Sequence, residues 1–125
     1  MSEKTSDKKR VLIINRRAPY GRSNARDALD VTLTCGVFEM PVSLLFADDG
    51  VFQLLGQHNA ADIGQKNLSA NLAVLPMYDI EDLYVCADSL QQHGLNADEL
   101  AHTVKTVQAS DIQALMRDHD VVLTF

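Results

Sequence analysis

The chain contains no tryptophan and only two cysteines, Cys35 and Cys86, among its 125 residues. The two cysteines lie far apart, so the CxxC pairs of a zinc ribbon or a thioredoxin-type redox motif are absent. The four histidines show no HxH or HxxxH spacing, which gives no support to a metal site. We therefore expect neither a metal ion nor another cofactor. A single disulfide between two cysteines would not be enough to hold together a fold of this size. We therefore expect free thiols and a reducing compartment, the cytoplasm.

Long apolar runs are also missing. No segment approaches the roughly 20 apolar residues that cross a bilayer, and the first ten residues, MSEKTSDKKR, lack the apolar core of a secretory signal. These absences predict a soluble chain without a membrane partner. The composition, 46% hydrophobic and 22% charged, is that of a globular protein and too apolar for a disordered one. The length predicts a single domain over residues 10–125, preceded by a flexible basic leader over residues 1–9.

Basic residues are scarce beyond the amino-terminal part of the chain. Eight of the 11 lie at or before Arg26, beside only two acidic residues, which gives this part a net charge of +6. From Asp27 onward, 15 acidic residues face three basic ones, which gives a net charge of −12. A body this acidic argues against direct nucleic-acid binding, because phosphate groups need a basic surface. The basic leader either steers an acidic partner or is merely a solvated tail and loop.

Short apolar runs alternate with helical patterns along the chain. Apolar runs without polar alternation predict strands buried on both faces, as in a parallel sheet. Strands are expected at residues 11–14, 42–46, 83–86, 103–107 and 121–125. A helix is expected from Ser23 or Asn24 to near Gly36 or to a point before Pro41. Further helices are expected at residues 51–55, 68–77, 87–93, 96–100 and 110–118. The alternation predicts an α/β fold, a three-layer sandwich with a mostly parallel sheet of about five strands.

Local signals predict how several of these helices pack and where they end. The residues expected to share the buried face of the first helix are Ala25, Ala28, Leu29, Thr32 and Cys35. Asp27 lies in its favourable first turn. Gly94 is typical of the C′ position that closes a helix, and Ser110-Asp-Ile-Gln113 has the pattern of a capping box. Asp48-Asp49-Gly50 is typical of a turn.

Ligand sites in parallel sheets form beyond the carboxyl ends of the strands. Three segments are expected to gather there: residues 15–23, 47–50 and 86–89. The first of them combines Gly21, Ser23 and arginines ahead of a helix N-terminus, as a phosphate cradle does. It lacks GxGxxG and GxxxxGK[ST], so an exposed crossover loop is the alternative.

Two kinds of reactive side chain occur in the other segments. Asp48 and Asp49 are either acid–base or magnesium-binding carboxylates or simple turn formers. Cys86 is the candidate catalytic residue, because helix N-terminal amides at a strand-to-helix junction stabilise a thiolate that attacks sulfur or carries a persulfide. Asp88 opposes that ionisation, and the alternative is a small apolar residue at a strand end. Cys35 is expected to pack as a small hydrophobe.

Two long segments resemble signatures of the TusC/DsrF family of sulfur-relay subunits. They are Ala47-Asp-Asp-Gly-Val-Phe-Gln-Leu-Leu55 and Met77-Tyr-Asp-Ile-Glu-Asp-Leu-Tyr-Val-Cys-Ala-Asp-Ser-Leu-Gln-Gln-His-Gly-Leu95, in the family's order. The Ala18-Pro-Tyr-Gly21 loop and the closing Asp120-Val-Val-Leu-Thr-Phe125 also fit. The resemblance therefore extends from Arg10 to Phe125.

The resemblance implies a DsrE/F-like fold and a place in a heterohexamer with TusB-like and TusD-like subunits. Such a complex accepts persulfide sulfur that originates from a cysteine desulfurase and passes it to a downstream sulfur-carrier protein. The sulfur ends as the 2-thio group of the wobble uridine of certain tRNAs. In the homologous Dsr system the assembly serves oxidative sulfur metabolism instead.

The resemblance also bears on Cys86, which falls in the Val-Cys-Ala-Asp-Ser-Leu stretch that corresponds to the cysteine segment of TusD-like subunits. Because the family's main persulfide site belongs to the TusD-like partner, Cys86 is implied to be an auxiliary thiol or an interface residue. The chain is then expected to be an accessory subunit that is not catalytic alone. The alternatives are a persulfide carrier through Cys86 and, from the α/β layout alone, a flavodoxin-like binder of a small ligand.

Overall fold

The computed structural model describes residues 8–18, 23–55, 72–100 and 102–125. Within these ranges five strands form one sheet in the order β4-β3-β2-β1-β5, and every neighbouring pair is parallel. The strands are β1 (Val11–Asn15), β2 (Val42–Phe46), β3 (Asp82–Cys86), β4 (Lys105–Val107) and β5 (Val121–Thr124). The predicted α/β class and the parallel sheet of about five strands are confirmed.

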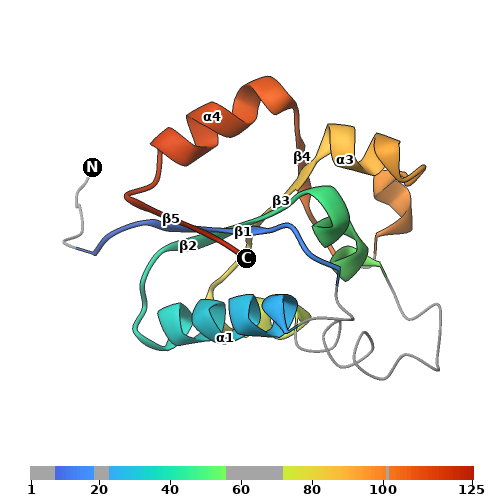
Figure 1. Ribbon diagram of the computed structural model, residues 1–125. Helices are drawn as coiled ribbons and strands as arrows, with labels where there is room; N and C mark the ends of the chain where they lie inside the picture. The colour runs from blue at the N-terminus through green and yellow to red at the C-terminus, as the bar shows by residue number, and fades with distance from the viewer. Residues whose placement is uncertain (1–7, 19–22, 56–71, 101) are drawn as a thin grey trace.

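Helices lie on both sides of this sheet, so that the structure has three layers (Figure 1). On one side are α1 (Asn24–Val37) and the short 3-10 helix η2 (Leu75–Tyr78), and on the other is α4 (Ala109–Arg117). The remaining short helices lie toward the carboxyl ends of the strands; they are η1 (Asp48–Leu54), α3 (Ala87–Gln92) and η3 (Ala97–Glu99). No helix within the described ranges is both long enough and apolar enough to cross a membrane.

The core is divided by the sheet into a large and a small cluster. The predicted inner face of α1 is confirmed, since the buried residues of this helix are Ala25, Ala28, Leu29, Thr32 and Cys35. They face sheet residues such as Ile13, Leu44 and Phe46 in the large cluster. The small cluster on the other face contains Leu12, Ile14 and Leu45, against which Ile112 and Leu115 of α4 pack. All residues of β1 and β2 are buried, because these inner strands are covered on both faces.

Helix boundaries were predicted with mixed success. Gly94 is confirmed at C′ of α3, with φ +67° and the N–H of Leu95 donating to the Leu90 carbonyl at 2.9 Å. The capping box at Ser110 is wrong, because α4 begins one residue earlier and the Gln108 N–H donates to Asp111 Oδ2 at 3.3 Å.

The Asp48–Gly50 turn was also predicted incompletely. These residues open the 3-10 helix η1, which continues through Leu54 into the segment that was expected to be a separate helix. Of the helix predicted at residues 68–77, residues 68–71 lie outside the described residues, and the described part contains the 3-10 helix η2 from Leu75. Residues 1–7 of the predicted leader also lie outside the described residues. The extent of that leader therefore stays a prediction.

Candidate functional site

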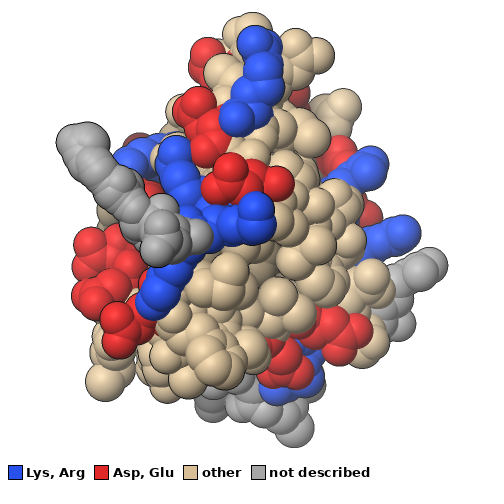
Figure 2. Space-filling view, turned by 90° about the vertical axis from the view of Figure 1, so that its left-hand side faces the viewer, with Lys and Arg blue, Asp and Glu red and all other residues tan. Residues whose placement is uncertain are grey.

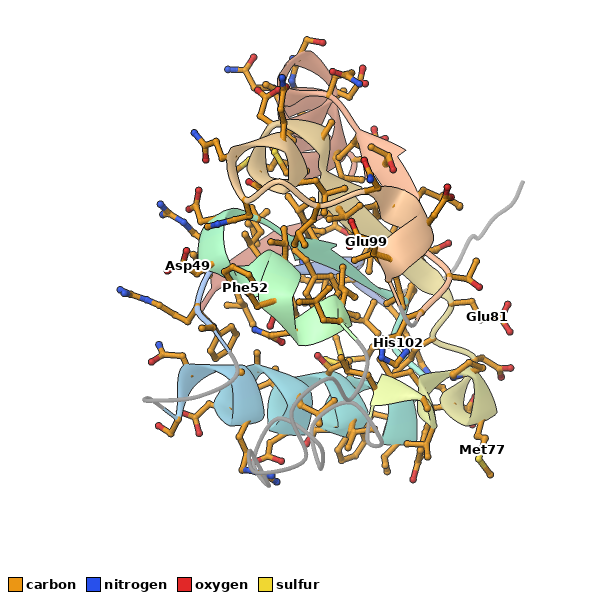
Figure 3. The ribbon with its side chains drawn as sticks, turned by 90° about the vertical axis from the view of Figure 1, so that its right-hand side faces the viewer. Asp49, Phe52, Met77, Glu81, Glu99 and His102 are labelled. Atoms are coloured by element: carbon orange, nitrogen blue, oxygen red, sulfur yellow. The ribbon has the colours of Figure 1, made fainter. Side chains whose placement is uncertain are left out.

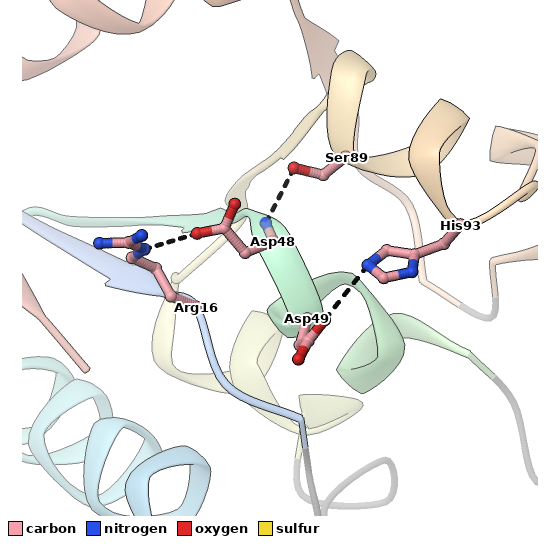
Figure 4. Close-up of polar contacts among 5 residues, drawn as sticks. All are labelled: Arg16, Asp48, Asp49, Ser89 and His93. Carbon is pink, nitrogen blue, oxygen red and sulfur yellow. Dashed lines mark hydrogen bonds and ion pairs between the residues drawn. The ribbon is translucent and has the colours of Figure 1, made fainter.

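The three segments expected beyond the carboxyl ends of the strands do meet there. Asp48 is the centre of the contact (Figure 4). Its carboxylate accepts a hydrogen bond from Arg16 Nε at 2.6 Å, and its backbone N–H donates to Ser89 Oγ at 2.8 Å. The neighbouring Ala47 N–H donates to the Asn15 carbonyl at 2.9 Å. The ends of β1, β2 and β3 are thereby joined, which confirms the predicted gathering of these loops.

Gly50 allows η1 to lie directly against the end of β1. A Cβ atom built on this glycine would lie 1.9 Å from the Asn15 carbonyl oxygen and 2.6 Å from the Asn15 carbonyl carbon. Backbone atoms cannot rotate away as a side chain can, so any larger residue would push the two elements apart. The glycine is needed here for close approach, whereas the sequence pattern suggested a turn.

A second polar contact extends the site toward α3. His93 Nε2 lies 3.3 Å from Asp49 Oδ1 (Figure 4). The His93 ring lies 4.5 Å from the Phe52 ring, centroid to centroid. Figure 3 shows Asp49 and Phe52 side by side on η1. His93 was missed as a site residue, because nothing in the spacing of the scattered histidines indicated that α3 ends beside η1.

The paired carboxylates are more consistent with holding the loops than with chemistry. Asp48 and Arg16 are each about half exposed at 50% and 57%, and such exposed ion pairs contribute about 0–1 kcal/mol. Among the described residues, no group of three histidine, cysteine or acidic side chains is placed to hold a metal ion. The magnesium interpretation of Asp48 and Asp49 therefore finds no third ligand in this part of the chain.

The region that was compared with a phosphate cradle is a small cavity at the carboxyl ends of β1 and β5. Its volume is about 400 Å³, and the residues that line it are Arg16, Arg17, Asn24, Asp48, Asp49, Thr124 and Phe125. Two carboxylates stand beside the two arginines, so the lining has no excess of positive charge for an anion. Gly21 lies outside the described residues.

Asn15 is the last residue of β1 and is 2% exposed. Its Nδ2 is a buried side-chain nitrogen without a hydrogen-bond partner, alone in this respect within the described ranges. Its backbone carbonyl accepts a hydrogen bond from the Ala47 N–H. Asn15 therefore fixes the junction through its backbone and leaves an amide unsatisfied.

Cys86 occupies the predicted junction, as the last residue of β3 directly ahead of α3. It is 7% exposed, and among the described residues its thiol has no hydrogen-bonding or charged partner. The adjoining helix has only six residues and carries Asp88 in its first turn. A thiol that is this covered, with neither a base nor a cation beside it, lacks the surroundings that activate a nucleophilic cysteine.

Cys35 lies on the inner face of α1, where it forms part of the large core cluster. Burial raises the pKa of its thiol above the ordinary value. The expectation that this residue packs as a small hydrophobe is confirmed.

Comparison with known proteins agrees with the fold and with the sequence signatures. The chain is 43% identical to a TusC homolog of Pseudomonas aeruginosa, over 91% of this chain and 96% of the relative. It is 34% identical to the intracellular sulfur oxidation protein DsrF of Allochromatium vinosum, over 94% and 96%, and 34% identical to a TusC homolog of Vibrio vulnificus, over 88% and 93%.

A solved structure shares the fold at lower identity. The ychN protein from E. coli superposes with a TM-score of 0.78 at 21% identity, covering 94% of this chain and 99% of its own. The model of the DsrE/DsrF-like family matches residues 9–125. Because this match spans nearly the whole chain and agrees with the relatives, the chain belongs to the DsrE/DsrF-like family.

Proposed function

We propose that this chain is a TusC-like accessory subunit of a sulfur-relay complex. It assembles with TusB-like and TusD-like subunits, and the complex passes persulfide sulfur to a downstream carrier for 2-thiolation of the tRNA wobble uridine. The observation that carries the proposal is the 43% identity to a TusC homolog across more than nine-tenths of both chains. The acidic body of the chain supports contact with protein partners over direct contact with tRNA.

The surroundings of Cys86 support an accessory role over a carrier role. A carrier thiol must reach a donor and then an acceptor, and it must ionise to attack sulfur. Cys86 is 7% exposed, and Asp88 follows it within the same short helix. Among the described residues, no hydrogen bond links its thiol to the side chains around Asp48 and Ser89.

The experiment is co-expression of the chain with its TusB-like and TusD-like counterparts, followed by light scattering of the purified material. We expect one stable complex that contains all three chains. A chain that stays monomeric beside correctly folded counterparts contradicts the proposal. In the assembled complex, Cys86→Ser is expected to leave sulfur delivery unchanged, with Cys35→Ser as the matched cysteine control.

The second candidate is an auxiliary thiol at Cys86 that carries persulfide itself. The position of Cys86 at the strand-to-helix junction favours this candidate, because Cys86 is the described cysteine nearest the loops that meet at Asp48. The test loads the complex with a cysteine desulfurase and cysteine, and maps peptides by mass. Added sulfur on the Cys86 peptide supports this candidate, whereas sulfur on a partner peptide alone excludes it.

Oxidative sulfur metabolism is the alternative destination of the sulfur, because the chain is also 34% identical to DsrF of Allochromatium vinosum. Deleting the gene and measuring 2-thiouridine in bulk tRNA separates the two. We expect the thiolated nucleoside to be lost. Unchanged thiolation together with impaired sulfur oxidation supports the DsrF-like alternative.

A further inference from the structure

Four large apolar side chains project into solvent at one corner of the molecule. They are Val37 and Phe38 at the end of α1, 65% and 66% exposed, and Met77 and Tyr78 of η2, 83% and 42% exposed. Single exposed hydrophobes are ordinary, but a contiguous group of them is typical of a docking surface. We name these four residues the apolar corner. Figure 3 shows Met77 directed outward from the ribbon.

The two halves of the apolar corner are held together by a close contact. A Cβ atom built on Gly36 would lie 3.0 Å from Tyr78 Cβ and 3.0 Å from Ile80 Cδ1, so η2 packs directly on the last turn of α1. The four side chains therefore belong to one surface, although about 40 residues separate the two elements in the sequence. The small residue at Gly36 makes this arrangement possible.

A cavity of about 760 Å³ adjoins the apolar corner at the amino ends of the strands. Val37, Met77 and Tyr78 line one side of it. The charged side chains that line it are Arg10, Glu39, Asp79 and Asp82. Three carboxylates against one guanidinium give the cavity a negative balance. Figure 2 views the molecule from this end of the sheet, where both basic and acidic side chains border a broad uncharged surface.

The carboxylates beside the apolar corner are available to a partner. Within the described ranges, neither Glu39 nor Asp79 forms an ion pair or a side-chain hydrogen bond. Asp82 lies 3.5 Å from Lys105, and both of these side chains are more than half exposed. Lys8 Nζ donates to the carbonyl oxygens of Phe38 at 2.9 Å and Glu39 at 3.4 Å, so one ammonium group also borders the apolar corner.

We propose that the apolar corner and the adjoining acidic cavity dock a protein partner that presents an apolar side chain flanked by lysine or arginine. The apolar corner is the anchor, since binding energy concentrates in a few large desolvated side chains. The acidic cavity receives the partner's cation and sets orientation and association rate. The negative balance of the cavity lining disfavours a phosphate group of nucleic acid or anionic lipid inside it. The inference rests on the proposed function, which supplies the partner as a subunit of the relay complex.

The test uses the full chain co-expressed with the TusB-like and TusD-like subunits. Met77→Asp is expected to weaken assembly about tenfold or more, because it places a charge in the anchor of the interface. Met116→Asp is the matched control, since Met116 is also exposed, at 39%, but lies on α4 outside the apolar corner. Thermal melting of both variants by circular dichroism verifies that each folds, and Met77→Gln repeats the test should Met77→Asp melt early.

The acidic cavity is tested separately by Glu39→Gln combined with Asp79→Asn. We expect slower association and a flatter dependence on salt, because the attraction between opposite charges is removed. Assembly of Met77→Asp that equals the wild type and Met116→Asp overturns this inference and leaves the proposed function standing. Failure of the wild type to assemble overturns the proposed function itself. Self-association of the chain that depends on Met77 replaces the partner by a second copy and also overturns the inference.

Discussion

The close approach of η1 to β1 predicts that Gly50→Ala destabilises the protein strongly. The added Cβ would lie 1.9 Å from the Asn15 carbonyl oxygen and 3.2 Å from the Arg16 backbone nitrogen. Both atoms belong to the end of β1, which is paired with β2 through Asn15 and Phe46. Neither atom can yield without moving the sheet, so η1 must move.

The size of the effect follows from these distances. Moving the new Cβ from 1.9 Å to a tolerable 3.0 Å requires a shift of about 1.1 Å. Such a shift breaks the 2.9 Å bond between the Ala47 N–H and the Asn15 carbonyl, and it disturbs the Asp48–Ser89 contact at 2.8 Å. Overpacking costs about 1–3 kcal/mol and each hydrogen bond about 1 kcal/mol. We expect a loss of about 2–5 kcal/mol, which for a domain of this size lowers Tm by roughly 8–20 °C.

The measurement is urea unfolding followed by far-ultraviolet circular dichroism. Gly94→Ala is the control, because Gly94 has φ +67° and a Cβ atom there would meet nothing within 4 Å. That variant carries backbone strain alone, about 1 kcal/mol. A loss for Gly50→Ala no larger than the loss for Gly94→Ala would refute the reasoning from close approach.

Three further predictions concern hydrogen bonding and pH. Ser89→Ala removes the acceptor of the Asp48 N–H and is expected to lower the free energy of unfolding by about 1 kcal/mol. Arg16→Ala removes an exposed ion pair and is expected to lower it by less than about 0.5 kcal/mol. Urea unfolding in which Arg16→Ala is the more destabilising variant contradicts this prediction. Burial raises the pKa of the Cys35 thiol, so the unfolded state loses this proton at a lower pH than the folded state does. Stability is therefore expected to fall as pH rises through about 9. Thermal melts of Cys35→Ala at several pH values are expected to show a smaller decline. Burial lowers the pKa of His102, so on acidification the unfolded state binds a proton before the folded state does. Stability is therefore expected to fall as pH drops through about 6.5. A His102→Gln variant whose stability declines below that pH as steeply as the wild type's contradicts this prediction.

Much of the fold followed from local patterns in the sequence. The spacing of Ala25, Ala28 and Leu29 identified the inner face of α1, because side chains three and four residues apart share one side of a helix. The apolar runs of β1 and β2 predicted strands covered on both faces. The parallel arrangement then predicted which loops meet, since carboxyl ends of parallel strands lie at one edge.

The pairings within the site did not follow from the sequence. The contact between His93 and Asp49 depends on how α3 ends beside η1, which no local spacing encodes. Gly50 looked like a turn residue, but its role depends on the Asn15 carbonyl 35 positions earlier in the chain. The start of α4 was misjudged because Gln108 and Asp111 compete with Ser110 and Gln113 for the same helix end.

The two ends of the sheet differ in how far the chain satisfies its own groups. At the carboxyl end, Asp48 is bonded to Arg16 and Ser89, and Cys86 is covered. The exception there is the buried Asn15 Nδ2, which has no hydrogen-bond partner among the described residues. At the amino end, Met77 is 83% exposed beside a cavity with a negative balance of charge. An enzyme concentrates unsatisfied and reactive groups in its site, whereas a subunit leaves apolar surface for its partners to cover. The exposed apolar surface of this chain therefore supports the proposed role as a subunit.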